Sequence, residues 1–328
     1  MGVNLEDLCD LCTPWCLQVA VTLRIAEHIR SAKSDIGELA AAVKCDRYVL
    51  HRMMKHLVSK GVFEETRAGY FSLNEAAQGL LDPRQRIGLD LNGIGGRMAG
   101  SWGTMLQYVQ TGAPAYAGVF GRPFWEDLDA HPEVGASFDD LIGPMGHGAP
   151  NAEFKIEGGW DDVRTVMDLG GGTGAMLAGI LRLHPNIQGT LLDLPRTVAS
   201  AGPIFDEAGV RDRVTMVGQS FLDPLPAGAD IYLLRGVLND WPDKDVSAIL
   251  RRCAVAAGDR GRVVVLKSVG ELATRGGLTI EMILLGGKHR TVEEFAALAR
   301  GSGLEVVSAG RQENGYCVVE CRSIVAVG

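Results

Sequence analysis

The sequence predicts a two-domain α/β protein whose C-terminal part is a doubly wound, mostly parallel sheet. From about residue 163 onward, mostly apolar strands alternate with helical segments; the strands read "RTVMDLG", "GTLLDL", "VTMVG", "ADIYLLRG" and "GRVVVLKS". Such strands are buried on both faces, so helical crossovers must cover both sides of the sheet. A glycine-rich loop follows the first strand, and 328 residues are enough for two cores of ordinary size.

The last two predicted strands differ from the others. "LEVVSAG" and "YCVVECRS" follow each other with no helical segment between them. Parallel neighbours need a long crossover, whereas antiparallel neighbours need only a short turn. The sequence therefore predicts an antiparallel edge on an otherwise parallel sheet.

Residues 4–81 predict helices followed by a hairpin. Asp35 and Glu38 have the spacing of a capping box, and Gly61 follows the end of a second short amphipathic helix. The segment "GVFEETRAGYFSLNE" then alternates around Ala68-Gly69, as the wing of a winged helix does. We therefore expect a winged-helix module at this end of the chain.

A winged helix suggests DNA binding, but composition argues for packing instead. The second helix, "RYVLHRMMKHLVSK", carries Arg52, Lys55 and Lys60 among a larger number of apolar residues. A net charge of −8 and a pI near 5.4 disfavour nucleic acid or an anionic membrane as a partner. The segment "TPWCLQVAVTLRIAEHI" offers more apolar surface than one small domain can hide, so we expect a homodimer.

Three segments are expected along the chain. The middle one contains "LNGIGGRMAGSWGTMLQYVQTG", whose glycine and methionine content suits a flexible, apolar-lined pocket wall. The predicted boundaries are residues 1–87 for the winged-helix dimerisation domain, 88–155 for a helical connector that contributes to the pocket, and 156–328 for the α/β domain.

Cysteine usage and the absence of targeting signals predict a cytoplasmic protein. No run of eighteen apolar residues and no basic stretch followed by an apolar core is present. Seven scattered cysteines do not form a disulfide framework in a chain of this size. Cys9, Cys12 and Cys16 share one face of a predicted helix with leucines, so we interpret them as buried small hydrophobic residues and expect no metal.

The glycine-rich loop predicts a nucleoside site. Gly170, Gly172 and Gly174 lie between the first strand and its helix, where a ligand can approach the backbone and meet the helix N-terminus. Ala175 stands where a dinucleotide-binding loop has its last glycine, so an NAD-dependent oxidoreductase is the weaker interpretation. Asp193 ends the second strand and is placed to accept the hydroxyl groups of a ribose.

Longer motifs resemble one family over nearly the whole chain. "DLGGGTG", "TLLDLPRTV", "LNDWPDKDVSAILRRCAVAAG" and "GGKHRTVEEFAALARGSGL" are similar to the plant-type, or caffeate-type, small-molecule O-methyltransferases, in particular the bacterial branch that acts on natural products. The resemblance implies a Rossmann-like domain that binds S-adenosylmethionine (SAM), with S-adenosylhomocysteine as product. It also implies a homodimer formed through the N-terminal domain.

The same resemblance assigns cofactor-binding roles to residues in the α/β domain. Near the methionine part, the ribose or the adenine of SAM it places Gly170, Gly172, Asp193, Leu194, Ser220, Phe221, Arg235 and Trp241. The predicted substrate pocket is lined by Trp125, Met145, His147, Asn239, Asp240, Glu281 and His289.

The sequence departs from the family at its acid-base positions. The family's His-Asp-Trp motif, in which the histidine is the general base, reads Asn239-Asp240-Trp241 here. An amide can orient a substrate but cannot accept its proton. Two positions that resemble acidic family sites hold Lys267 and His289. A phenol of pKa ~10 is ionised only to about one part in a thousand at pH 7, a handicap of roughly 4 kcal/mol.

Three explanations of the missing base remain open. The substrate nucleophile is already ionised or basic, so that proximity to the methyl donor carries catalysis. Alternatively His289 or His147 replaces the base, although each is equally well explained as a structural or surface histidine. Lys267 is a weaker candidate, because a strand-end lysine paired with a carboxylate explains it better. The third is that the scaffold binds SAM but catalyses decarboxylation, hydroxylation or cyclisation.

Two further functional classes compete with an enzyme. A catalytically inactive partner subunit would bind the cofactor and stabilise an active relative, which is consistent with the missing histidine. A winged-helix regulator with a nucleoside sensor would need a basic recognition face, which the acidic composition disfavours. We favour a methyltransferase in which Asn239 is less important than a true base.

Overall fold

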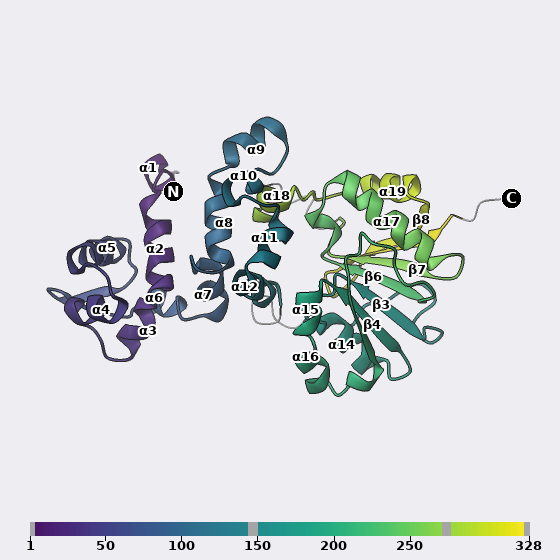
Figure 1. Ribbon diagram of the computed structural model, residues 1–328, viewed down its shortest axis with the longest axis horizontal. Coiled ribbons are helices and arrows are strands. Elements are labelled where there is room, and N and C mark those ends of the chain that lie inside the picture. The colour runs from purple at the N-terminus through teal and green to yellow at the C-terminus, as the bar shows by residue number, and fades with distance from the viewer. Residues whose placement is uncertain (1–3, 144–149, 271–276, 325–328) are drawn as a thin grey trace. The chain divides into compact units, whose positions relative to one another are not determined.

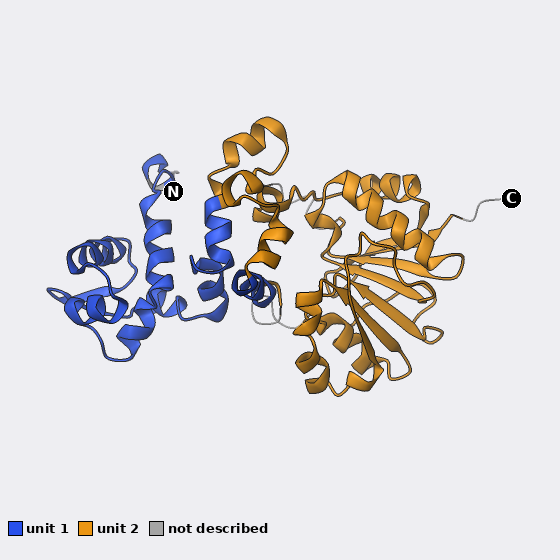
Figure 2. Cartoon of the chain, viewed as in Figure 1, with its two compact units in different colours: residues 1–100, 132–141 blue, residues 101–131, 142–328 orange. Residues whose placement is uncertain are grey.

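The computed structural model describes residues 4–143, 150–270 and 277–324, and these form two compact units. Unit 1 comprises residues 1–100 and 132–141, and unit 2 comprises residues 101–131 and 142–328 (Figure 2). Figure 1 shows both units and labels most of their helices and several of their strands.

Unit 1 is built from short helices and one hairpin. Its first elements are α1 (Leu5–Leu8), α2 (Cys12–Thr22), α3 (Ile25–Arg30), α4 (Ile36–Val43), α5 (Arg47–Ser59), β1 (Glu64–Arg67) and β2 (Tyr70–Ser72). They are followed by α6 (Glu75–Gly79), α7 (Pro83–Leu89), α8 (Ile94–Trp102) and α12 (Pro132–Ile142). The predicted antiparallel hairpin is confirmed, since β1 and β2 pair antiparallel.

Local signals in the sequence explain where these helices begin and what they bury. Asp35 is the N-cap of α4 and accepts hydrogen bonds from the N–H groups of Gly37 (2.8 Å) and Glu38 (3.2 Å). The apolar face of α5 lies in the core of its own unit, while Lys55 and Lys60 form ion pairs with acidic residues. The helix that resembles a recognition helix therefore serves packing within its own unit.

The interpretation of the N-terminal cysteines as buried residues is wrong. Cys9 lies between α1 and α2, outside both helices, and it is exposed in the single chain. Cys12 is exposed as well, and Cys16 is half-buried. Because α1 ends at Leu8, the three residues do not share one continuous helix face.

Unit 2 contains a seven-stranded sheet with helices on both faces. Before the sheet come α9 (Met105–Thr111), α10 (Tyr116–Phe120) and α11 (Phe124–Ala130). The sheet segment comprises β3 (Thr165–Leu169), α14 (Ala175–Leu183), β4 (Gln188–Asp193), α15 (Pro195–Ala199), α16 (Gly202–Glu207), η1 (Arg211–Arg213), β5 (Val214–Gly218), β6 (Ile231–Arg235), η2 (Leu238–Asp240), α17 (Asp243–Ala257), β7 (Arg262–Leu266), α18 (Ile280–Leu285), α19 (Val292–Gly301), β8 (Leu304–Arg311) and β9 (Cys317–Ser323).

The strand order confirms the predicted topology. The order is β5-β4-β3-β6-β7-β9-β8; the first five strands are parallel, and β9 pairs antiparallel with both β7 and β8. The chain reverses direction across the sheet between β3 and β6. In open α/β sheets, ligands bind outside the carboxyl ends of the strands at such a switch point.

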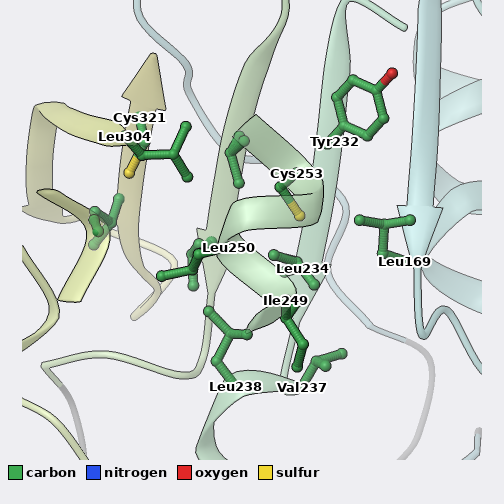
Figure 3. Packing of buried hydrophobic residues seen from close by; sticks show 14 of the residues in the cluster. Leu169, Tyr232, Leu234, Val237, Leu238, Ile249, Leu250, Cys253, Leu304 and Cys321 are labelled. Carbon is green, nitrogen blue, oxygen red and sulfur yellow. The ribbon is translucent and has the colours of Figure 1, made fainter. Parts of the chain in front are cut away.

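Alternating side chains of the buried strands fill two separate clusters. On β6, Tyr232 and Leu234 contribute to a cluster with α17 and α19, whereas Ile231 and Leu233 contribute to one with α14. Figure 3 shows the first cluster, in which Ile249, Leu250 and Cys253 of α17 lie against the sheet. This packing fixes the strand ends that carry the candidate site. Among the described residues, none of the helices is long and apolar enough to cross a membrane.

Truncation of Leu250 should destabilise unit 2. Leu250 is fully buried, so Leu250→Ala removes apolar contacts and leaves a cavity, which should lower the free energy of unfolding by about 3 kcal/mol. Val255→Ala on the same helix is the control, because Val255 is 83% exposed and should cost less than about 0.5 kcal/mol. Urea unfolding measures both; equal losses would contradict the assigned packing.

Candidate functional site

The glycine-rich loop between β3 and α14 requires glycine for two different reasons. Gly170, Gly172 and Gly174 all have positive φ angles, of 66°, 60° and 85°. At Gly170 space is also limited, because a Cβ would lie 2.9 Å from Val237 and 3.2 Å from Phe221. At Gly172 the space beside the backbone is open. The loop thus leaves its backbone accessible to a ligand at the carboxyl end of β3.

Asp193 ties this loop to the end of β4. One carboxylate oxygen accepts the Gly172 N–H at 2.7 Å, and the other accepts the Leu194 N–H, also at 2.7 Å. Burial raises the pKa of Asp193 even though these two donors oppose the shift. Each oxygen keeps a further lone pair, so the carboxylate can still accept hydrogen bonds from a ligand.

Aromatic side chains gather beside the loop. The Phe221 ring meets the edge of the Trp241 ring at a centroid distance of 5.7 Å, and Trp125 stacks on Trp241 at 6.3 Å. Ser220 stabilises the turn after β5, because its Oγ accepts the Leu222 N–H at 3.1 Å. The structure therefore brings together predicted residues from three distant parts of the sequence.

Asp168 is a charged residue of the site that sequence reasoning missed. It lies on β3, is 1% exposed, and its Oδ2 has no hydrogen-bond partner in the described structure. Burial and the nearby Asp193 raise its pKa to about 7, while Arg235 opposes the shift. The Nε of Arg235 is likewise buried without a partner. An acidic residue inside the apolar strand "TVMDL" was the signal that could have revealed it.

The amide of Asn239 is held by two side chains. Its Nδ2 donates to Oδ1 of Asp240 at 2.7 Å, and its Oδ1 accepts a hydrogen bond from Ser268 Oγ at 3.0 Å. Ser268 follows the end of β7 and was also missed by sequence reasoning. Ser268 thus orients the Asn239 amide through its oxygen, and the amide donates a hydrogen bond to the Asp240 carboxyl group through its nitrogen.

The carboxyl group of Asp240 has a strongly raised pKa. Burial, together with the charge of Glu281, raises the pKa of the Asp240 carboxyl to about 8. Glu281 lies in the first turn of α18 and is exposed. A carboxyl group with this pKa is a far stronger base than an ordinary aspartate, which titrates near pH 4.

Arg290 holds the whole turn in place. Its guanidinium is buried and donates to the carbonyl oxygens of Leu238 and Trp241, each at 2.8 Å, and it pairs with Asp243 at 2.8 Å. Arginine can do this because its five N–H donors have a fixed, planar arrangement. The clamp spans Asn239 and Asp240, so it fixes the backbone on both sides of them.

The backbone of the Gly286-Gly287 segment also approaches this turn closely. The Lys288 N–H donates to the Asn239 carbonyl oxygen at 3.0 Å. A Cβ on Gly287 would collide with that same oxygen, so only glycine fits there. The segment "GGKHR" therefore stabilises the Asn239 turn in three ways: Gly287 allows close approach, the Lys288 N–H donates a hydrogen bond, and Arg290 binds the backbone carbonyl groups.

The remaining predicted site residues have varied environments. His289 is half-buried, and its Nε2 has no hydrogen-bond partner among the described residues. Lys267 is exposed, and its ammonium lies 5.4 Å from the centroid of the Tyr316 ring, so it is not a desolvated catalytic amine. Met145 and His147 lie outside the described residues.

A glycine loop and an acidic strand end at the switch point of a parallel sheet define a nucleoside-binding α/β protein. Residues 102–305 match the family model of the O-methyltransferase domain, and residues 6–83 match that of the O-methyltransferase dimerisation domain. The chain therefore belongs to the O-methyltransferase family, whose methyl donor is SAM, as the resemblance predicted.

Relatives act on aromatic natural products. The chain is 38% identical to the 2,7-dihydroxy-5-methyl-1-naphthoate 7-O-methyltransferase of Streptomyces carzinostaticus over 94% of each chain. It is 36% identical to the aclacinomycin 10-hydroxylase RdmB of Streptomyces purpurascens, over 94% of this chain and 85% of that one. A crystal structure of the O-methyltransferase NcsB1 with SAM and 2-hydroxy-5-methyl naphthoic acid aligns with a TM-score of 0.88 and 36% identity, covering 98% of this chain and 99% of the other.

Asp168 should make stability depend on pH. Its folded pKa of about 7 lies above the ordinary aspartate value of about 4, so the folded state binds an extra proton between these values and loses stability as pH rises. Between about pH 5 and about pH 7 the loss should be roughly 2 kcal/mol. Asp168→Asn should flatten this dependence in urea unfolding without ligand; an unchanged slope would contradict the assigned pKa.

Proposed function

We propose that this chain methylates a hydroxyl group of a small aromatic or polycyclic natural-product intermediate, with Asp240 as the general base and Asn239 as its positioning residue. The observation that carries the proposal is the hydrogen-bonded series Ser268, Asn239 and Asp240 at the place where the family has its histidine. When bound, SAM would supply an activated methyl group for transfer to the substrate oxygen.

The residues around the glycine loop fit that methyl donor. Gly170 and Gly172 leave room for its methionine part, and Asp193 can accept hydrogen bonds from the ribose. The unpartnered Asp168 Oδ2 and Arg235 Nε are buried polar atoms that a zwitterionic ligand could satisfy. We place the remaining predicted cofactor residues beside the adenine: Leu194, Ser220, Phe221 and Trp241.

Asp240 compensates for the missing histidine. Its pKa of about 8, against about 4 for an ordinary aspartate, makes proton transfer from a phenol less unfavourable by about 6 kcal/mol. The Asn239 amide cannot take the proton itself, but its N–H keeps the carboxylate oriented. His289 directly precedes Arg290, and its Nε2 is buried and unpartnered. We propose that this nitrogen contacts the substrate.

The pocket and the assembly complete the proposal. Trp125, which stacks on Trp241, and Glu281 are proposed to contact the substrate together with Met145 and His147. We propose a homodimer without a nucleic-acid partner, working in the cytoplasm. Support for dimerisation comes from three exposed apolar side chains of the matched dimerisation domain, Leu8, Leu11 and Trp15, and from Leu5 directly before it.

Hydroxylation is the second candidate, because one relative is named as a hydroxylase. Incubation with methyl-labelled SAM and hydroxylated naphthoates, including 2,7-dihydroxy-5-methyl-1-naphthoate, separates the alternatives. We expect label in the product and an equal amount of S-adenosylhomocysteine by mass spectrometry. A transformed product without label would support the hydroxylase-like alternative, and binding of SAM without any turnover of a substrate panel would support an inactive partner subunit.

The pH dependence of the rate should identify the base. For a phenolic substrate, kcat/KM should rise with pH and level off near the Asp240 pKa of about 8. Asp240→Asn should lower kcat on the order of a hundredfold and remove this levelling, so that the rate rises until the phenol itself ionises near pH ~10.

Asn239→Ala distinguishes positioning from base catalysis. It removes the donor to Asp240 but not the carboxyl group, so kcat should fall only about tenfold. A fall approaching a thousandfold with unchanged SAM affinity would show that the amide itself is central. Ser268→Ala is the matched control on the other side of the amide, with an expected effect of at most about tenfold.

A further inference from the structure

We propose that Cys12, Cys16 and His56 form a zinc-binding site in unit 1. One ligand atom from each residue lies within 4.8 Å of the other two, and no other group of this kind occurs among the residues that the structure describes. Cys12 and Cys16 are one turn apart on α2, and His56 comes from the last turn of α5. The site would therefore join α2 to α5.

The distances agree with tetrahedral zinc coordination. Zinc lies about 2.3 Å from a thiolate sulfur, which puts two sulfurs of a tetrahedral site roughly 3.8 Å apart. The two Sγ atoms here are 3.6 Å apart, so the pair is already at the spacing that one shared ion requires. Three protein ligands leave a fourth position, which water can occupy.

The chemistry of the three side chains selects the ion. Thiolate and imidazole ligands favour zinc over magnesium or calcium, which prefer oxygen. Binding releases the two thiol protons, and the resulting thiolates neutralise the charge of Zn²⁺. The half-buried position of Cys16 is therefore compatible with the bound ion, because the complete site carries no net charge.

One ring nitrogen of His56 already has a hydrogen-bond partner. Its Nε2 lies 2.8 Å from Thr13 Oγ1, and the Thr13 hydroxyl donates to Asp10 Oδ2 at 2.6 Å. The histidine therefore donates its Nε2 proton to Thr13 in this arrangement. The lone pair of a neutral His56 is then on Nδ1, and coordination through Nδ1 keeps this hydrogen bond, which orients the ring. Coordination through Nε2 breaks it at a cost of about 1 kcal/mol, which coordination to zinc outweighs.

The test uses the full-length protein purified with a reductant, loaded with Zn²⁺ and freed of excess metal by gel filtration. Elemental analysis should find about one zinc per chain. Cys16→Ser and His56→Ala should each lower zinc retention at least about tenfold. Cys9→Ser is the matched control, because Cys9 is a neighbouring exposed cysteine outside the cluster, and it should retain zinc like the unchanged chain.

A second measurement covers any variant that folds poorly. Replacement of zinc by Co²⁺ in the unchanged protein should give the intense absorption of thiolate-to-cobalt charge transfer, and an added chelator should abolish it and lower the Tm. Absence of retained metal, full retention in Cys16→Ser, equal loss in Cys9→Ser, or a Cys12–Cys16 disulfide that forms in place of metal binding would each overturn the proposal.

Discussion

The buried guanidinium of Arg290 is the interaction on which the candidate site depends. It donates to the backbone carbonyl groups on both sides of Asn239 and Asp240 and neutralises Asp243 at the start of α17. A buried cation with all its donors directed at fixed acceptors tolerates little displacement. The turn that contains Asn239 and Asp240 is therefore held in one conformation, and the Asp240 carboxyl group has one orientation.

The parallel sheet gathers the other groups at one edge. β3, β4, β6 and β7 end side by side, and their ends carry or precede Gly170, Asp193, Arg235 and Ser268. The two clusters of apolar side chains on either face of the sheet hold these ends in register. The residues proposed to bind the methyl donor thus depend on these packed strands, while the proposed acid-base group depends on the short turn after β6.

The fold and the cofactor loop were predictable from the sequence because they rest on local patterns. Strand alternation, glycine spacing and Asp193 at a strand end can each be read along the chain. The clamp by Arg290 could not be predicted, since it joins residues about fifty positions apart. The hydrogen bond from Asn239 to its neighbour Asp240 could not be predicted either, because it depends on side-chain direction. The interpretation of the N-terminal cysteines was wrong for a related reason. The chain leaves the helix between α1 and α2, and Cys12 lies near His56 of a different helix, which no local pattern reveals.

Replacing the clamp while keeping its charge tests the central claim most directly. Arg290→Lys preserves the positive charge but loses the planar set of donors, so the turn should loosen and kcat/KM for methyl transfer should fall on the order of a hundredfold. Lys288→Met is the control, because Lys288 makes only exposed ion pairs through its side chain, and it should change the rate less than about threefold. A folded Arg290→Lys protein with the full rate would contradict the account.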